Sequence, residues 1–266
     1  MKQGNFVEAK RFFLRTITLV FFLILTGGAA LFGQEADDEE PIDWRARWRP
    51  ENRWFIGPYA GYSHNTLFTG GSEQIMYFTT FRAGHGTTVG LPIRFHIFTW
   101  FAIQVEANYI MKNYTMRRTG DYGYLEDKNT NSFVNFPVIF HFAVPLMNGP
   151  VSLFANTGFY MGLWAASRRQ GRAIAISTPV YDYDEMHTFD SRYDNRFESG
   201  LLAGFGIQYN FRRLSLFAEW RYNYGLTDLH KQMQLNQAPY LNDTWTIHTG
   251  ILFNGNLFKR YGEKTQ

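Results

Sequence analysis

The sequence predicts an all-β chain: an eight-stranded antiparallel up-and-down transmembrane β-barrel, preceded by a signal peptide. Three observations predict this fold class. Apolar and polar residues alternate over many segments, which places them on opposite faces of a strand. Aromatic residues make up 18% of the 266 residues, and large aromatic side chains favour pleated surfaces and membrane–water interfaces. Short turns alternate with long polar stretches, as in outer-membrane barrels.

The first 33 residues have the layout of a secretory signal peptide. A basic start that ends at Arg15 precedes an apolar run over 17–25, and small residues follow over 27–33. This order is typical of export signals. We expect cleavage after Gly33, with Ala30 as the second candidate. A membrane anchor is the alternative, but the apolar run is shorter than the roughly 20 residues that a spanning helix needs.

Three further segments follow the signal peptide. Residues 34–52 contain the acidic run Glu35–Glu40, which predicts a solvated periplasmic linker. Residues 53–254 hold the predicted barrel, and 255–266 form a short C-terminal tail. No later segment has 18 consecutive apolar residues, so the mature chain is expected to cross a membrane only with strands. These features predict export through the inner membrane and a location in the bacterial outer membrane.

Eight segments carry the two-residue period of a half-buried strand. In 103–114, for example, Ile103 and Val105 alternate with Gln104 and Glu106. A helix would spread these residues around its whole circumference. The predicted strands are 54–64, 88–97, 103–114, 132–144, 151–163, 197–211, 214–224 and 244–253. The stretches 65–86, 115–131, 165–195 and 225–243 are expected to be long loops outside the cell, with the short turns and both termini in the periplasm.

The two faces of these strands differ in chemistry. One face is bulky and apolar, whereas the other carries most of the charged residues. A barrel of eight strands has an interior barely wide enough for its side chains, so the apolar face is expected to meet lipid. A soluble barrel with its apolar face inside is the alternative. Aromatic residues near strand ends are expected to form interfacial girdles: Trp54, Trp100, Trp164, Trp220, Trp245, Tyr62, Tyr114 and Tyr224.

The charge and cysteine content exclude some classes of protein. The formal net charge of +3 arises within the first 33 residues, and the rest of the chain is neutral. A nucleic-acid partner is therefore not expected, because such binders keep a basic excess in the folded part. The chain has no cysteine, which rules out disulfides, thiolate zinc sites and a catalytic thiol.

Several motifs resemble the PorT-like outer-membrane β-barrel domain family. They are Asn135–Val138 (NFPV), Gly200–Gly206 (GLLAGFG), Glu219–Asp228 (EWRYNYGLTD) and the last strand, His248–Phe253 (HTGILF). The resemblance covers about residues 53–254. It implies fold and location, and for the last strand a terminal signal read by the barrel-insertion machinery. The namesake of the family is tied to a protein-secretion system, a role that fold-level similarity does not transfer.

Charged residues on the inward face are the first candidates for function. A salt-bridge network that fills the narrow lumen is the favoured interpretation, because buried charges must be paired. A proton or ion path is the alternative. The predicted network consists of Arg94, Glu106, Lys112, Glu198, Glu219 and Arg221.

The predicted loops carry two further charge clusters. The basic cluster Arg168, Arg169 and Arg172 could pair with lipid phosphates or acidic sugars. The acidic residues Asp182, Asp184 and Glu185 lack the ordered spacing of a calcium loop. Solvated surface is the favoured interpretation of both clusters. The seven histidines show no metal-binding spacing, so neither a metal nor another cofactor is expected.

Catalysis has one local candidate, the adjacent Ser63 and His64. Neighbouring residues on a strand point to opposite faces, so these two side chains should not meet. The favoured function is therefore a non-enzymatic outer-membrane barrel whose surface loops have structural, adhesive or partner-binding roles. The alternatives are a barrel enzyme acting on lipid or peptide and a barrel that binds or transports a small ligand. Expected partners are outer-membrane lipids, the insertion machinery and an envelope protein of unknown identity.

Overall fold

The computed structural model describes residues 53–69, 79–120, 123–146, 150–175, 178–211, 214–229, 231 and 240–254. The predicted signal peptide (1–33), acidic linker (34–52) and C-terminal tail (255–266) lie outside these described residues.

Strands dominate the described residues and form a single antiparallel sheet. Among these residues, no helix has the length and hydropathy needed to span a bilayer. The strands are β1 (Trp54–Ile56), β2 (Tyr59–Thr69), β3 (Thr79–His96), β4 (Phe101–Met111), β5 (Tyr114–Gly120), β6 (Gly123–Pro145), β7 (Val151–Ala175), β8 (Thr178–Met186), β9 (Phe197–Asn210), β10 (Leu214–Gly225) and β11 (Tyr240–Asn254).

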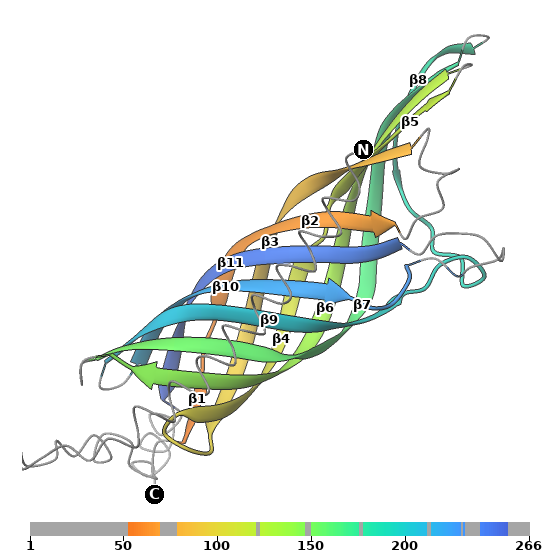
Figure 1. Ribbon diagram of the computed structural model, residues 1–266. Helices are drawn as coiled ribbons and strands as arrows, with labels where there is room; N and C mark the ends of the chain where they lie inside the picture. The colour runs from red at the N-terminus through yellow and green to blue at the C-terminus, as the bar shows by residue number, and fades with distance from the viewer. Residues whose placement is uncertain are drawn as a thin grey trace, which may run out of the picture. The chain divides into compact units, whose positions relative to one another are not determined.

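The sheet closes into a barrel of eight strand positions (Figure 1). β1 and β2 are two parts of the first strand, and both pair with β3 on one side and β11 on the other. The ring continues through β4, β6, β7, β9 and β10 back to β11. The predicted eight-stranded antiparallel barrel is therefore confirmed. Closure leaves no sheet edge within the ring. A free edge would be unfavourable there, because lipid cannot hydrogen-bond to its backbone groups.

Side chains alternate between the lumen and the outer wall as the sequence pattern predicts. On β4, for instance, Val105 is 48% exposed on the outer wall, while its neighbours Gln104 and Glu106 are buried in the lumen. A continuous apolar band of this size on a single chain requires lipid around it. The band includes Val89, Leu91, Ile93, Phe95, Phe136, Leu153, Phe159, Met161, Leu163, Leu201, Phe205, Ile207 and Ile247, each at least 42% exposed.

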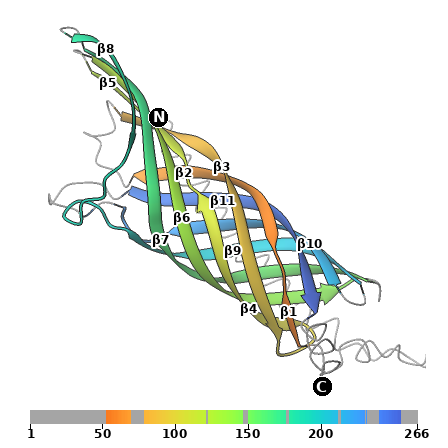
Figure 2. The same cartoon turned by 180° about the vertical axis from the view of Figure 1, so that it is seen from behind.

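Several strands continue beyond the barrel wall, contrary to the prediction of long loops. Residues 79–82 of β3, 115–120 of β5, 123–131 of β6, 167–175 of β7 and all of β8 pair in that order. Both views show the ends of these strands reaching past the barrel (Figures 1 and 2). We call this part the projecting sheet. The expectation of loops over much of 65–86, 115–131 and 165–195 was wrong. Both faces of this sheet carry polar residues, so the apolar–polar alternation disappears although pairing continues.

Two of the predicted girdle residues lie inside the barrel. Trp164 is 2% exposed and Tyr114 is 7% exposed, and both belong to a buried apolar cluster. Assigning them to the lipid interface was therefore wrong. Up to Trp164, every second residue of β7 points into the lumen, and Trp164 is one of these inward residues. The register shifts directly after it, between the pairs of Phe133 and Ser132, so the inward and outward positions exchange beyond that point. Outward exposure is retained by others, such as Trp100 at 43% and Tyr62 at 38%.

Candidate functional sites in the lumen and on the projecting sheet

Arg221 is the centre of a buried charge network in the middle of the lumen. Its guanidinium binds Glu106 through both terminal nitrogens, at 2.7 and 2.8 Å. It also donates to Glu219 at 2.8 and 3.0 Å. The Nε2 atom of His248 lies 3.2 Å from Glu219, and the Tyr59 hydroxyl donates to Glu106 at 3.0 Å. Every member is at most 4% exposed, so water does not screen these pairs. We call this group the Arg221 network.

Arg94 joins the Arg221 network through glutamine side chains. Its Nε donates to Gln104 at 2.6 Å and its Nη1 donates to Gln208 at 2.6 Å. Gln104 passes the connection on by donating to Glu106 at 2.5 Å. The guanidinium of Arg94 thus has amide oxygens as its direct partners rather than a carboxylate. The relay gives the Nε and Nη1 atoms of Arg94 a partner each, whereas its buried Nη2 atom has none among the described residues.

Lys112 and Glu198 form a second buried pair, nearer the end of the barrel that carries the projecting sheet. The Lys112 Nζ lies 2.5 Å from Glu198, and both side chains are at most 1% exposed. Glu198 also accepts hydrogen bonds from Asn242 at 3.0 Å and from Tyr160 at 3.3 Å. The ammonium lies 4.9 Å from the ring centres of both Phe133 and Tyr160. Ring faces attract a cation at this distance, so the site is built around a charged lysine.

Two apolar clusters pack against these charges within the lumen: Phe133 of the first faces Lys112, and Phe154 of the second faces Arg94. One cluster lies at the end nearest the projecting sheet, and the other lies near the short turns. Between the Arg221 network and Tyr160 lies a cavity of about 10 Å³, enough for about one water molecule. The described lumen is therefore filled rather than open. The first cluster contains Leu67, Ile110, Tyr114, Phe133, Trp164 and Leu229; the second contains Tyr59, Ala143, Phe154, Phe217 and Leu252.

The structure thus brings the six predicted lumen residues together as two groups. Arg94, Glu106, Glu219 and Arg221 share the Arg221 network, while Lys112 and Glu198 pair separately. An ion path along these charges would have to cross both apolar clusters. The arrangement therefore favours a structural role. The apolar residues of the lumen were not predicted, because an apolar residue on the inward face resembles an interruption of the sequence pattern.

The two predicted loop clusters bind each other on the projecting sheet. Arg168 donates to Asp184 through two nitrogens at 2.7 and 2.6 Å, and Arg172 donates to Asp182 at 2.7 and 3.3 Å. These partners lie on the paired strands β7 and β8. Hydrogen bonds from Arg168 and Gln170 lower the pKa of Asp184 to about 2. The two guanidinium groups and the two carboxylates therefore neutralise each other on this face of the sheet.

Arg169 and Glu185 lie on the opposite face of the same hairpin. They are directly paired between β7 and β8, one position away from the ion pairs. Near them, Tyr183 crosses above Gly171, where an added Cβ would lie 2.4 Å from the tyrosine oxygen. Burial and the neighbouring Asp127 raise the pKa of Tyr183 to about 12. The basic cluster predicted from the sequence is therefore split between two faces.

Ser63 and His64, the catalytic candidate in the sequence, lie on opposite faces of β2. Ser63 is fully buried and donates to the backbone oxygen of Met111 at 2.7 Å, whereas His64 points outward. The predicted separation of these two residues is thus what the structure shows. His187 lies 2.9 Å from Asp194, but no hydroxyl of the described part of the chain hydrogen-bonds to the His187 ring in the manner of a triad. The paired carboxylates Glu106 and Glu219 are enclosed with Arg221.

The outer wall carries a histidine pair that was not predicted from the sequence. His64 on β2 and His85 on β3 are directly opposite in the strand register. Their Nδ1 atoms are 3.4 Å apart, and the Tyr62 hydroxyl hydrogen-bonds to the same His85 nitrogen. The two histidines are 21 residues apart in the chain, so a search for ligands spaced along one element could not pair them. Only the alignment of β2 with β3 reveals them.

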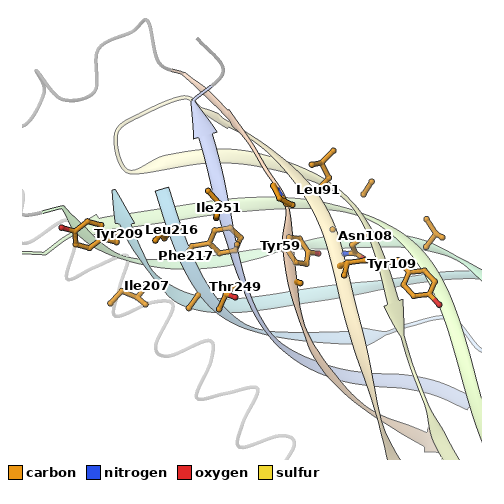
Figure 3. Close-up of a pocket in the computed structure, with 18 of the residues that line it drawn as sticks. Tyr59, Leu91, Asn108, Tyr109, Ile207, Tyr209, Leu216, Phe217, Thr249 and Ile251 are labelled. Atoms are coloured by element: carbon orange, nitrogen blue, oxygen red, sulfur yellow. The ribbon is translucent and has the colours of Figure 1, made fainter. Parts of the chain in front are cut away.

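A largely apolar hollow involves several strands of the barrel (Figure 3). Its residues include the exposed Leu91, Ile207 and Leu216, together with the inward-pointing Tyr59 and Phe217. None of the described residues that line it is charged. Its lining is mostly apolar, and its polar side chains include Asn108, Tyr109 and Thr249.

A family of known proteins matches most of this chain. The outer membrane protein beta-barrel domain family matches residues 32–231. A comparison with curated proteins finds no match. Among solved structures, the chain is similar to OprG from Pseudomonas aeruginosa, with 11% identity and a TM-score of 0.42 over 76% of this chain and 96% of that chain. It is similar to Neisserial surface protein A, with 11% identity and a TM-score of 0.39 over 75% and 96%. It is also similar to Ail from Yersinia pestis, with 12% identity and a TM-score of 0.35 over 76% and 99%. Because the family match spans most of the chain, this protein belongs to the outer membrane protein beta-barrel domain family and its barrel lies in the bacterial outer membrane.

Proposed function

We propose that this chain is a non-enzymatic outer-membrane barrel that presents its projecting sheet for structural, adhesive or partner-binding contacts. The observation that carries the proposal is the contrast between the two ends of the strands. The lumen is filled by paired charges between apolar clusters, whereas β3, β5, β6, β7 and β8 build an ordered surface beyond the barrel. A filled barrel supports presentation better than transport.

The edge of β8 is the part of the projecting sheet best suited to contact a protein. Within the described residues, β8 pairs only with β7. Its other edge therefore offers backbone groups to which an extended segment could add as a strand. Val180, Tyr181 and Met186 on β8 are 55%, 66% and 64% exposed. Exposed apolar side chains beside a free backbone edge favour a protein partner over a sugar or an ion.

Capture with matched variants tests this role. The purified barrel in detergent is used to capture partners from an envelope extract, and the variant Val180→Asp/Tyr181→Lys is compared with the wild type. Tyr193→Lys is the control, because Tyr193 is 54% exposed but lies outside β8. We expect a stoichiometric partner that the β8 variant loses and the control retains. Equal capture by all three proteins would contradict the role of this edge.

Because the lumen is filled, we expect the barrel not to conduct ions. In planar lipid bilayers, the purified protein should give no stable porin-like current steps, because both apolar clusters would have to open for ions to pass. Large, reproducible steps would overturn the closed barrel and favour the transport alternative. Hydrolysis of lipid or peptide by the purified protein would favour the enzyme alternative.

We also propose that the chain is exported by a cleaved signal peptide and inserted by the barrel-insertion machinery. The sequence supports cleavage after Gly33, and the motifs of Asn135–Val138 and Gly200–Gly206 support a finer placement in the PorT-like group. The short turns and both termini would then face the periplasm. Sequencing the N-terminus of the protein from purified outer membrane tests the first point: a start near Gln34 is expected, and an intact Met1 would contradict it.

A further inference from the structure

The outer wall of the barrel carries a group of three side chains whose donor atoms converge. Tyr62 and His64 are on β2 and His85 is on β3, and all three point away from the lumen. The two Nδ1 atoms lie 3.4 Å apart, and the Tyr62 oxygen contacts the Nδ1 atom of His85. Two neutral rings can share one proton across such a gap, but two protonated rings would repel each other. The neutral imidazole is the form of histidine that binds metal ions.

The spacing of the two nitrogens fits a single metal ion. Bonds of about 2.0–2.1 Å from zinc to histidine nitrogen in a tetrahedral site place two ligands about 3.3–3.4 Å apart. The observed separation of 3.4 Å already has this value. The described residues contain no group of three or more His, Cys, Asp or Glu side chains around one point, so the two imidazoles are the donors that the protein supplies. The Tyr62 hydroxyl hydrogen-bonds to one of them. The remaining coordination positions face outward.

Neighbouring groups hold this arrangement in place. The ring of Trp245 on β11 stacks on His64 with centroids 4.9 Å apart and an interplanar angle of 29°. Asn113 donates to the backbone oxygen of His85 at 2.6 Å. The Tyr62 ring stacks on His85 with centroids 5.7 Å apart. Metal ligands are commonly oriented by such contacts. The site also lies at the penultimate residue pair of the β2–β3 ladder, where a hydrated ion can approach from the membrane interface.

We infer that His64 and His85, with Tyr62 hydrogen-bonded beside them, form a surface site for one late first-row divalent metal ion at the rim of the barrel. Imidazole donors suit copper, nickel and zinc, whereas magnesium and calcium prefer sites built only from oxygen. The affinity order of such ligands places Cu²⁺ above Ni²⁺ and Zn²⁺. The site lies on the outer wall, apart from the lumen and the projecting sheet, so it can be present whether or not the proposed function holds.

Copper binding by the full-length protein without a histidine tag tests the site. The protein is refolded into phosphatidylcholine vesicles and titrated with Cu²⁺ against a competing chelator. We expect one equivalent to bind, with two nitrogen couplings in the electron paramagnetic resonance spectrum. His64→Gln and His85→Gln should each weaken binding at least tenfold. Tyr62→Phe should weaken it less, and Mg²⁺ and Ca²⁺ should not compete. His187→Gln is the matched control, because His187 belongs to another ring cluster, and it should bind as the wild type does.

A second readout covers variants that fold poorly. Cu²⁺ bound at His64 should quench the fluorescence of the stacked Trp245, so Trp245→Phe should keep the bound equivalent but lose most of the quenching. Copper binding that is unchanged in both His64→Gln and His85→Gln would overturn the site, as would the absence of saturable binding. If these variants instead changed only the association with anionic lipid, the pair would be a headgroup contact and the metal site would be refuted.

Discussion

Replacing Arg221 by methionine tests the energetic role of the Arg221 network. Arg221, Glu106 and Glu219 have side chains that are at most 3% exposed. The guanidinium makes four hydrogen bonds of 2.7 to 3.0 Å to the two carboxylates. Methionine fills much of the same volume but leaves both carboxylates buried beside each other without their arginine partner. Removing one partner of a buried ion pair costs about 3–5 kcal/mol.

This loss is large enough to measure by equilibrium unfolding. Because about 1.4 kcal/mol corresponds to a tenfold change, the folding constant should fall between roughly a hundredfold and several thousandfold. The assay is urea unfolding of the barrel refolded into lipid vesicles, followed by tryptophan fluorescence. The triple variant Glu106→Gln/Glu219→Gln/Arg221→Met removes all three charges and should recover most of the lost stability. Arg172→Met, in an exposed pair, should give no measurable change. A cost below about 1 kcal/mol for Arg221→Met, or no recovery in the triple variant, would refute the reasoning.

Three further results are expected. Trypsin added to intact cells should cut at Arg192 before Arg168 or Arg172, because Arg192 is exposed in a turn while the other two are paired in strand β7. Mass spectrometry identifies the first cleavage site, and first cleavage at Arg168 would contradict the projecting sheet. Gly200→Ala should lower the folded fraction, because the new Cβ would lie 2.5 Å from the Tyr160 ring and 2.3 Å from the backbone oxygen of Tyr224. Such overpacking costs about 1–3 kcal/mol. Electrophoretic mobility of unheated samples reports the folded fraction, and a fully folded variant would be inconsistent with this packing. The ion pair between Arg168 and Asp184 should persist in mild acid, because hydrogen bonds from Arg168 and Gln170 lower the pKa of the Asp184 carboxyl to about 2, below the ordinary aspartate value. Its contribution to stability is complete above the ordinary aspartate pKa and is lost as the pH falls towards 2. A carboxyl chemical-shift titration with a midpoint near the ordinary aspartate value would disprove the pairing.

The order of the strands and the faces they present were predictable from the sequence. Alternation is a local property: each residue of a strand points away from its neighbours, so the apolar band and the inward charges appear directly in segments such as 103–114. Lipid outside and a narrow lumen inside then determine which face is which. All six predicted lumen residues lie inside the barrel, four in the Arg221 network and two in the separate Lys112–Glu198 pair.

The partners of those residues depended on the register between strands, which the tertiary structure alone decides. Arg168 finds Asp184, and His64 finds His85, only because β7 aligns with β8 and β2 with β3 at a particular offset. The projecting sheet was missed for a related reason. Beyond the membrane both faces of a strand meet polar surroundings, so backbone pairing continues without any alternation to reveal it. Trp164 and Tyr114 show the converse case: their chemistry suits an interface, but strand parity turns them into the lumen, where they close the barrel.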